Sequence, residues 1–272
     1  MRLIPYPPGI IMGGEIIFKG QNLLQASDEE LRHIRGDRIS MIFQEPTTSL
    51  NPVFNINSQI SEALIVHRKI DREAAAEETI KLLKLVGIPD AERRAQDYPH
   101  QFSGGMQQRI MIAMALSCNP ELLIADEPTT SVDVTVQAQL LELIDNLRSQ
   151  FGTSVIIITH NLGVVARYVD RVNVMYAGRL VETGPTEVIY GDPKHPYTLG
   201  LMASVPRLDL PRDRELHVIE GLPPNLARLP QGCYFNPRCY LATDTCRKET
   251  PEMVEVGEDH YTACFRWSEV KK

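Results

Sequence analysis

The sequence has no run of apolar residues approaching the roughly 18 that a membrane-spanning helix needs. Its first eight residues, Met1 to Pro8, also lack the continuous apolar segment of a secretion signal. We therefore expect a cytosolic chain whose contact with a membrane is made through a partner. Basic residues are in the minority, with 28 Lys and Arg against 35 Asp and Glu, so the net charge of −7 gives no reason to expect nucleic acid as a partner.

The phosphate-loop motif is absent as well. Where it occurs, this loop reads Gly-x-x-x-x-Gly-Lys followed by Ser or Thr, and its amides, lysine and hydroxyl hold the phosphates and magnesium of a nucleotide. None of the 17 glycines here is followed by lysine. Any nucleotide site within this sequence would therefore lack that loop.

An anion-binding helix start is indicated just after residue 102. Ser103 is a favourable N-cap residue, and Gly104 and Gly105 let the backbone approach a ligand closely, so the free amides of the following helix can face an anion. A phosphate would fit there. Taken alone, the stretch is equally typical of an ordinary helix capped by serine.

Two adjacent acids follow the next predicted strand. The run from Leu122 to Ala125 is apolar without alternation, which is typical of a strand buried on both faces of a parallel sheet. Such sheets bind ligands beyond the carboxyl ends of their strands, where Asp126 and Glu127 lie. One acid could hold magnesium while the other orients or deprotonates an attacking water. An acidic turn is the simpler alternative, which Pro128 and the nearby Asp133 make less attractive.

Two further apolar strands also end in polar residues. Ile39 to Phe43 leads to Gln44, and Val155 to Thr159 leads to His160. Each of these side chains, taken alone, is typical of a solvated or structural position. Together with the acid pair they predict an α/β fold with a site at one edge of a parallel sheet.

These segments resemble, in order and spacing, the motifs of ABC-type ATPases. The resemblance includes the signature at Phe102 to Met106, the Walker B strand at Leu122 to Glu127, the D-loop at Thr130 to Asp133 with Val132 where Leu is more usual, the Q-loop at Gln44, Glu45 and Pro46, and the H-loop at His160.

The resemblance implies a P-loop NTPase-like ABC ATPase core that uses ATP and Mg²⁺. It implies that Gln44 contacts magnesium or the attacking water, that Asp126 binds magnesium, that Glu127 is catalytic and that His160 contacts the γ-phosphate. Ser103, Gly104, Gly105 and Asp133 would contact nucleotide, in a site formed between two ATPase subunits.

The carboxyl-terminal part indicates which group of ABC ATPases the chain resembles. From Gly191 onward proline becomes frequent and hydrophobic periodicity weakens, and His195-Pro196-Tyr197-Thr198 precedes a short helix. This tail resembles that of oligopeptide and dipeptide importer ATPases. Chromosome-type ABC ATPases carry very long coiled coils between the Q-loop and the signature, whereas 58 residues separate Gln44 from Ser103 here, which favours a transporter over a DNA-repair protein.

Four of the five cysteines lie in this tail. Cys233, Cys239, Cys246 and Cys264 have five, six and seventeen residues between them, and four thiolates can hold either a zinc ion or an iron–sulfur cluster. The spacing is not that of paired Cys-x-x-Cys units, so zinc is the weaker interpretation. Relatives in the resembling group carry a similar set, which favours a 4Fe-4S cluster, with free thiols as the alternative.

We expect four segments. They are an incomplete amino-terminal core with the Q-loop at 1–56, a helical subdomain at 57–102, the signature, Walker B, D-loop and H-loop part of the core at 103–190, and the extension with the cysteines at 191–272. The resemblance also implies that the Walker A segment lies upstream of Met1, so we expect a fragment or a truncated gene product.

The leading hypothesis is an ATP-binding subunit of an oligopeptide or dipeptide importer, with its own nucleotide site impaired. By the resemblance, its partners would be a second ATPase subunit and two transmembrane permease subunits, with an extracytoplasmic peptide-binding protein acting indirectly. It would lie peripherally on the cytoplasmic face of the cell membrane and bind no nucleic acid. The alternative is a non-hydrolysing pseudo-ATPase that only pairs with another subunit.

Overall fold

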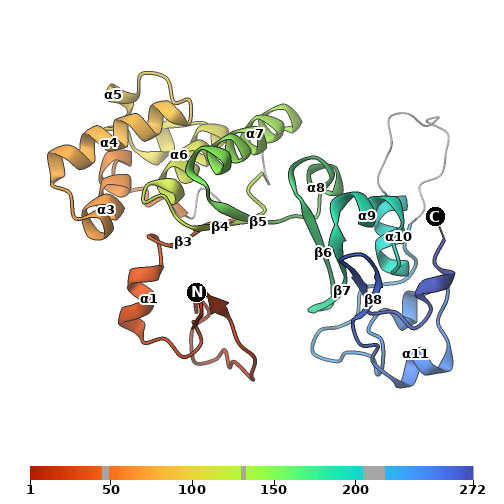
Figure 1. Cartoon of the computed structure of the whole chain (residues 1–272). Coiled ribbons are helices and arrows are strands. Elements are labelled where there is room, and N and C mark those ends of the chain that lie inside the picture. The colour runs from red at the N-terminus through yellow and green to blue at the C-terminus, as the bar shows by residue number, and fades with distance from the viewer. Residues whose placement is uncertain (45–48, 130–132, 205–217, 272) are drawn as a thin grey trace. The chain divides into compact units, whose positions relative to one another are not determined.

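A computed structural model of the chain describes residues 1–44, 49–129, 133–204 and 218–271 (Figure 1). It divides into two compact units, Met1–His160 and Asn161–Lys272. None of the described helices combines the length and the apolar character needed to cross a bilayer. The four segments expected from the sequence are a finer division than these two units, and their boundaries stay predictions.

The first unit is built on a three-stranded parallel sheet. Its strands are β3 (Ile39–Ile42), β4 (Leu122–Asp126) and β5 (Ser154–Ile158), in the spatial order β3-β4-β5. The register aligns Ile42 with Ala125, and Ala125 with Ile157. Helices connect the successive strands, as parallel pairing requires. The predicted α/β fold with a parallel sheet is confirmed.

Helices α6 (Gly104–Leu116) and α7 (Val134–Phe151) pack with one face of this sheet in a common core. Helix α6 is apolar on nearly all sides and eight of its residues are buried, as expected for a helix enclosed by neighbours. Leu123 and Ala125 of β4 belong to the same core as Leu140 and Ile144 of α7. The strand ends are therefore anchored from this side by close packing.

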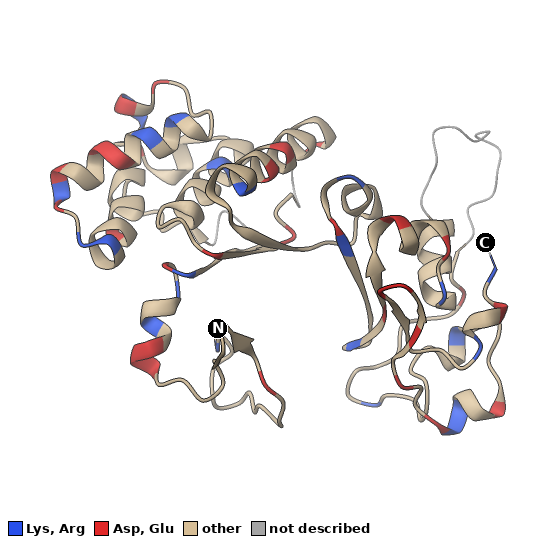
Figure 2. Cartoon of the chain, viewed as in Figure 1, with Lys and Arg blue, Asp and Glu red and all other residues tan. Residues whose placement is uncertain are grey.

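The segment predicted as a helical subdomain, residues 57–102, is largely helical, and its division from the rest of the unit stays a prediction. It comprises α3 (Ile56–Arg68), α4 (Arg72–Leu85), the short α5 (Ala91–Arg94) and the 3-10 turn η1 (Pro99–Gln101). Asn55 and Asp71 cap α3 and α4 through their side chains. Exposed charges of both signs alternate along these helices (Figure 2), as in the Lys81–Glu78 pair at 3.2 Å. Such surface pairs stabilise little, so the helices depend on their buried apolar faces.

The amino-terminal residues form a small layer of their own. Strands β1 (Ile17–Phe18) and β2 (Gln21–Asn22) pair, and α1 (Asp28–Ile34) begins with the expected capping box. Glu30 accepts from the Ser27 amide at 2.7 Å while the Ser27 hydroxyl accepts from the Glu30 amide at 3.2 Å. Leu31 of α1 packs in a second core with residues of β3 and β4.

Although its residues 155–158 are all apolar, β5 is only partly buried. Exposure alternates along this strand, and Ile156 and Ile158 are 49% and 47% exposed. The reason is that the amino-terminal layer packs against Ile39 of β3 and Leu122 and Ile124 of β4, and includes no residue of β5. An unbroken apolar run therefore did not distinguish a strand covered on two faces from one covered on one.

The second unit contains a four-stranded antiparallel sheet in the order β6-β7-β9-β8. Strands β6 (Arg171–Tyr176) and β7 (Arg179–Pro185) form a hairpin joined at Ala177 and Gly178, whose φ values of +48° and +80° suit a tight turn. The sequence did not indicate that β8 (Val254–Gly257) and β9 (His260–Thr262) return to extend this sheet. The remaining elements are α8 (Leu162–Tyr168), α9 (Thr186–Gly191), α10 (Pro196–Ala203), η2 (Asn236–Arg238), α11 (Asp244–Lys248) and η3 (Trp267–Glu269).

A buried carboxylate joins three parts of this unit. Glu182 of β7 is 0% exposed and accepts hydrogen bonds from the Lys194 amide at 2.5 Å and the His195 amide at 3.1 Å. His260 of β9 approaches the same carboxylate through Nε2 at 2.8 Å. These bonds satisfy a charge that would otherwise be costly to bury, and they fix the segment ahead of α10 against the sheet.

We expect Glu182→Ala to lower the free energy of unfolding of the second unit by about 3–5 kcal/mol, because it removes the acceptor of several buried donors. Thermal unfolding, with hydrogen exchange at the β7 and β9 amides, measures the change. Glu258→Ala is the matched control, since it removes an exposed carboxylate from the β8–β9 turn and should cost less than about 0.5 kcal/mol. Equal effects of the two substitutions would contradict the assignment.

Candidate functional site

Glu127 occupies a special backbone position at the end of β4. Its φ is +45°, a left-handed conformation that costs a residue other than glycine about 1–3 kcal/mol. Its amide donates to the Ile158 carbonyl at 2.8 Å, which ties the turn to the end of β5. The buried Pro128 follows directly. Strained residues held in this way concentrate at functional sites, so the backbone marks Glu127 independently of its sequence context.

The polar residues from the other two strand ends meet at this carboxylate. The Gln44 amide nitrogen donates to Oε2 of Glu127 at 3.1 Å. Nδ1 of His160 lies 3.0 Å from Oε1. The predicted convergence of Gln44, Glu127 and His160 at one edge of the sheet is therefore confirmed. The Glu127 side chain is 24% exposed and that of His160 78%, so the cluster opens to solvent.

Asp126 is the last residue of β4 and is half-buried. By strand alternation it shares a face with Leu122 and Ile124, whereas Ala125 packs into the core under α6 and α7. Its carboxylate forms no hydrogen bond or ion pair with any residue in the described part of the chain, unlike that of Glu127. The two adjacent acids thus have different surroundings.

The helix predicted to begin after Ser103 is present, whereas its binding of an anion stays a prediction. Ser103 stands at the N-cap of α6 but its side chain makes no capping bond, and both it and Gly104 are exposed. Gly105 has a packing role, because a Cβ there would lie 3.0 Å from Cγ1 of Val136 on α7. No described hydrogen bond joins these residues to the Glu127 cluster.

Asp133 caps α7 by accepting from the Val136 amide at 2.9 Å. This contact accounts for its position structurally and leaves its predicted nucleotide role untested. The rest of the expected D-loop, residues 130–132, and the Glu45 and Pro46 part of the expected Q-loop lie outside the described residues.

Sequence reasoning missed two buried glutamines on α6. Gln108, 1% exposed, donates to the Pro128 carbonyl and so holds the turn that follows Glu127. Gln107 donates to the carbonyls of Pro99 at 2.8 Å and Phe102 at 3.2 Å, which shapes the loop ahead of the helix. Two consecutive amides on an otherwise apolar helix were the available signal, because buried polar groups need partners.

The four cysteines of the tail come together in the second unit. All four line one small cavity, together with His195, Phe235 and Arg266 among others. Gly232, at φ +74°, permits this, because a side chain there would clash with the Cys246 carbonyl. The Cys233 amide donates to that carbonyl at 2.9 Å. None of the thiols of Cys233, Cys239, Cys246 and Cys264 is part of a disulfide.

Burial makes these thiols hard to ionise. Burial, together with the smaller effect of like charges on the neighbouring cysteines, raises the pKa of Cys239 from 9.0 to about 11 and that of Cys264 to about 12. As they stand, no three His, Cys, Asp or Glu side chains among the described residues are grouped to hold one metal ion. Four thiolates in this cavity would need a strongly positive group to compensate their charge.

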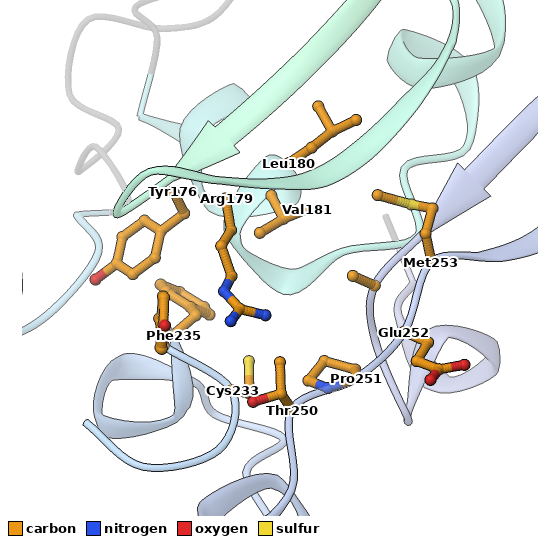
Figure 3. Close-up of a pocket in the computed structure, with 12 residues that line it drawn as sticks. Tyr176, Arg179, Leu180, Val181, Cys233, Phe235, Thr250, Pro251, Glu252 and Met253 are labelled. Carbon is orange, nitrogen blue, oxygen red and sulfur yellow. The ribbon is translucent and has the colours of Figure 1, made fainter. Parts of the chain in front are cut away.

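A larger cavity of about 520 Å³ adjoins the thiols and shares Cys233, Phe235 and Pro251 with the smaller one. In Figure 3 the Arg179 side chain extends into it from β7, with Phe235 and Cys233 on one side and Met253 on the other. The Arg179 guanidinium lies 4.7 Å from the centre of the Tyr234 ring. Of the thiols, Cys233 is thus the one that borders both cavities.

Comparison with known proteins decides the family. Residues 7–130 match the family model described as ABC transporter, and residues 181–246 match the one described as oligopeptide/dipeptide transporter, C-terminal region. The oligopeptide transport ATP-binding protein OppD of Bacillus subtilis is 52% identical over 261 residues, covering 96% of this chain and 73% of that protein. The chain belongs to the ABC transporter family.

Within the ABC family, the second match places the chain in the oligopeptide/dipeptide group. The dipeptide transport ATP-binding protein DppD of Bacillus subtilis is 50% identical over 265 residues, covering 97% of this chain and 79% of that protein. Among solved structures, the dimeric ATP-binding cassette MJ0796 bound to ADP and Pi has a TM-score of 0.58 and 27% identity, covering 64% of this chain and 74% of that one. The expected ABC ATPase fold is confirmed.

The cysteine cavity leads to a test of thiol reactivity. In the reduced, metal-free ABC chain at pH 8, we expect Cys239 to react with a disulfide reagent about 100-fold more slowly than an ordinary thiol. The reason is that a pKa raised from 9.0 to about 11 lowers the thiolate fraction tenfold per unit. Stopped-flow labelling with peptide mapping measures the rate, and the chain unfolded in guanidinium is the control. Equal native and unfolded rates would contradict the burial.

Proposed function

We propose that this chain is the ATP-binding subunit of an ABC importer for dipeptides or oligopeptides, which couples ATP hydrolysis to transport through two membrane permease subunits. The observation that carries the proposal is the Glu127 carboxylate held between Gln44 and His160 at the end of a parallel sheet. The tail match and the names of the relatives, oligopeptide and dipeptide transport ATP-binding proteins, support the cargo class.

The hydrogen bonds of the cluster support complementary roles for its residues. Gln44 uses its amide nitrogen on Glu127, so its amide oxygen is left to face a cation. His160 uses Nδ1 on Glu127, so Nε2 is left for a phosphate oxygen. Glu127 then orients the attacking water and accepts its proton, and the adjacent Asp126 carboxylate holds magnesium. When bound, Mg²⁺ neutralises charge that develops on the phosphates.

The exposed amides at Ser103 and Gly104 suit a second subunit. They lie at the start of a long helix and are not bonded to the Glu127 cluster, so we assign them, with Gly105 and Asp133, to nucleotide held by a partner ATPase. The assembly would be peripheral, on the cytoplasmic face of the membrane, with an extracytoplasmic peptide-binding protein acting through the permeases and without nucleic acid.

The exposed helix start at Ser103 and Gly104 also suits a second candidate function. In that case the chain would act as a non-hydrolysing partner that contributes only its signature residues. The two functions differ in whether Glu127 of this chain carries out chemistry.

In the assembled transporter, we expect Glu127→Gln to lower the rate of ATP hydrolysis by about 100-fold or more, because the amide cannot accept the proton of the attacking water. Phosphate release by the purified complex in vesicles measures the rate. Glu142→Gln, an exposed glutamate on α7, is the control and should leave the rate unchanged. An unchanged rate with Glu127→Gln would favour the non-hydrolysing partner.

We also propose that the four cysteines hold a 4Fe-4S cluster, because four thiols line one cavity and none of them is used elsewhere in a disulfide. When bound, the cluster would supply positive iron to four thiolates and a one-electron redox centre. Each of Cys233, Cys239, Cys246 and Cys264 would ligate one iron.

Anaerobic reconstitution of the full chain with iron and sulfide tests this proposal. We expect about four irons per chain, and Cys239→Ser should lose most of them. Cys118→Ser is the matched control, since Cys118 is also buried but lies in the first unit at the end of α6, and it should keep the iron content. One zinc per chain, or no metal at all, would refute the cluster.

A further inference from the structure

His195, the histidine of the His-Pro-Tyr-Thr run, faces the cysteine cavity and has so far been given no role. It is 1% exposed and stands at the N-cap of α10. It lines the same cavity as the four thiols. The cap on α10 accounts for one nitrogen of this buried ring, and the other nitrogen, Nε2, needs a separate explanation.

The backbone and the ring of His195 are both fixed. Its amide donates to the buried Glu182 carboxylate at 3.1 Å. Its Nδ1 accepts a hydrogen bond from the Tyr197 amide at 3.1 Å. The ring also packs against Phe235, with 5.8 Å between the ring centres. These contacts hold the imidazole in one orientation, and Phe235 itself follows Cys233 by two positions.

The Tyr197 contact decides which ring nitrogen carries the proton. Since Nδ1 accepts from a backbone N–H, the neutral imidazole has its proton on Nε2. Burial supports the neutral form, because it lowers the pKa of His195 from 6.5 to about 4. No residue in the described part of the chain forms a hydrogen bond with Nε2 of His195. The polar atom that the ring can offer to the cavity is therefore an N–H donor.

We infer that His195 Nε2–H donates a hydrogen bond to a sulfur atom of the group held by the four cysteines. The inference rests on the proposed cluster. His195 is then a positioning and tuning residue, and it is not a ligand, because a neutral ring with Nδ1 engaged and Nε2 protonated has no free lone pair for iron. Arg266 also lines the cavity, but its guanidinium is bound to the Glu269 carboxylate.

A donor to sulfur stabilises the reduced cluster, which carries one more negative charge, so it raises the reduction potential. In the reconstituted full chain we expect His195→Leu to keep its iron and to shift the potential to more negative values. His195→Gln retains an N–H donor and a carbonyl acceptor for the Tyr197 amide, so its potential should lie closer to the wild type. Redox titration followed by electron paramagnetic resonance measures both.

His260→Gln is the matched control. Among the histidines of this unit that the structure describes, His260 is the other buried one, it bonds to Glu182, and it does not line the thiol cavity. Its potential should equal that of the wild type. If His195→Leu keeps iron and shows the wild-type potential, or if His260→Gln shifts the potential equally, the inference is wrong.

A second measurement needs no substitution. In the reduced wild-type cluster labelled with ¹⁵N-histidine, pulsed electron paramagnetic resonance should show one weakly coupled nitrogen and an exchangeable proton. A strong nitrogen coupling, or loss of iron from both His195 variants, would make His195 a ligand and overturn the inference. A wild-type chain that takes up no iron overturns the cluster and the inference together, whereas an iron-loaded chain without the nitrogen coupling overturns the inference alone.

Discussion

The parallel, in-register pairing of β3, β4 and β5 is the constraint on which the candidate ATPase site depends. Because Ile42, Ala125 and Ile157 lie level across the sheet, the residues that follow each strand emerge at the same edge. Three segments separated by dozens of residues thereby deliver an amide, two acids and an imidazole to one place. A slip of one residue in any pairing would turn every side chain of that strand to the opposite face.

The strained turn at Glu127 completes what the sheet begins. Its positive φ is maintained by the bond of its amide to the Ile158 carbonyl and by Gln108, which holds the next carbonyl from a buried position on α6. The turn that carries the Glu127 carboxylate is thus held by the core helix, although it lies at the open edge of the candidate site. This arrangement makes the buried glutamine as much a part of the site as the exposed residues it supports.

The sequence could predict this edge because each of its members follows an apolar run of strand length. Spacing predicted the helices of residues 57–100 and the capping box at Ser27 for the same reason, since each depends on residues close in the chain. The exposure of one face of β5 could not be predicted, because it arises from a layer that packs against β3 and β4 and includes no residue of β5. The pairing of β9 with β7 joins residues about 80 apart, and its decisive contact, Glu182 with His260, has no local signal.

The same long-range contact explains why a histidine, rather than another N-cap residue, is suited to the start of α10. Serine or aspartate would cap the helix equally well, but neither could accept from the Tyr197 amide and at the same time offer an N–H group to the cavity that the cysteines line. Glu182 fixes the backbone at this position, and Phe235 fixes the ring. The histidine therefore satisfies two requirements with one side chain, a helix cap on Nδ1 and a donor on Nε2, and only the second depends on what the cysteines hold.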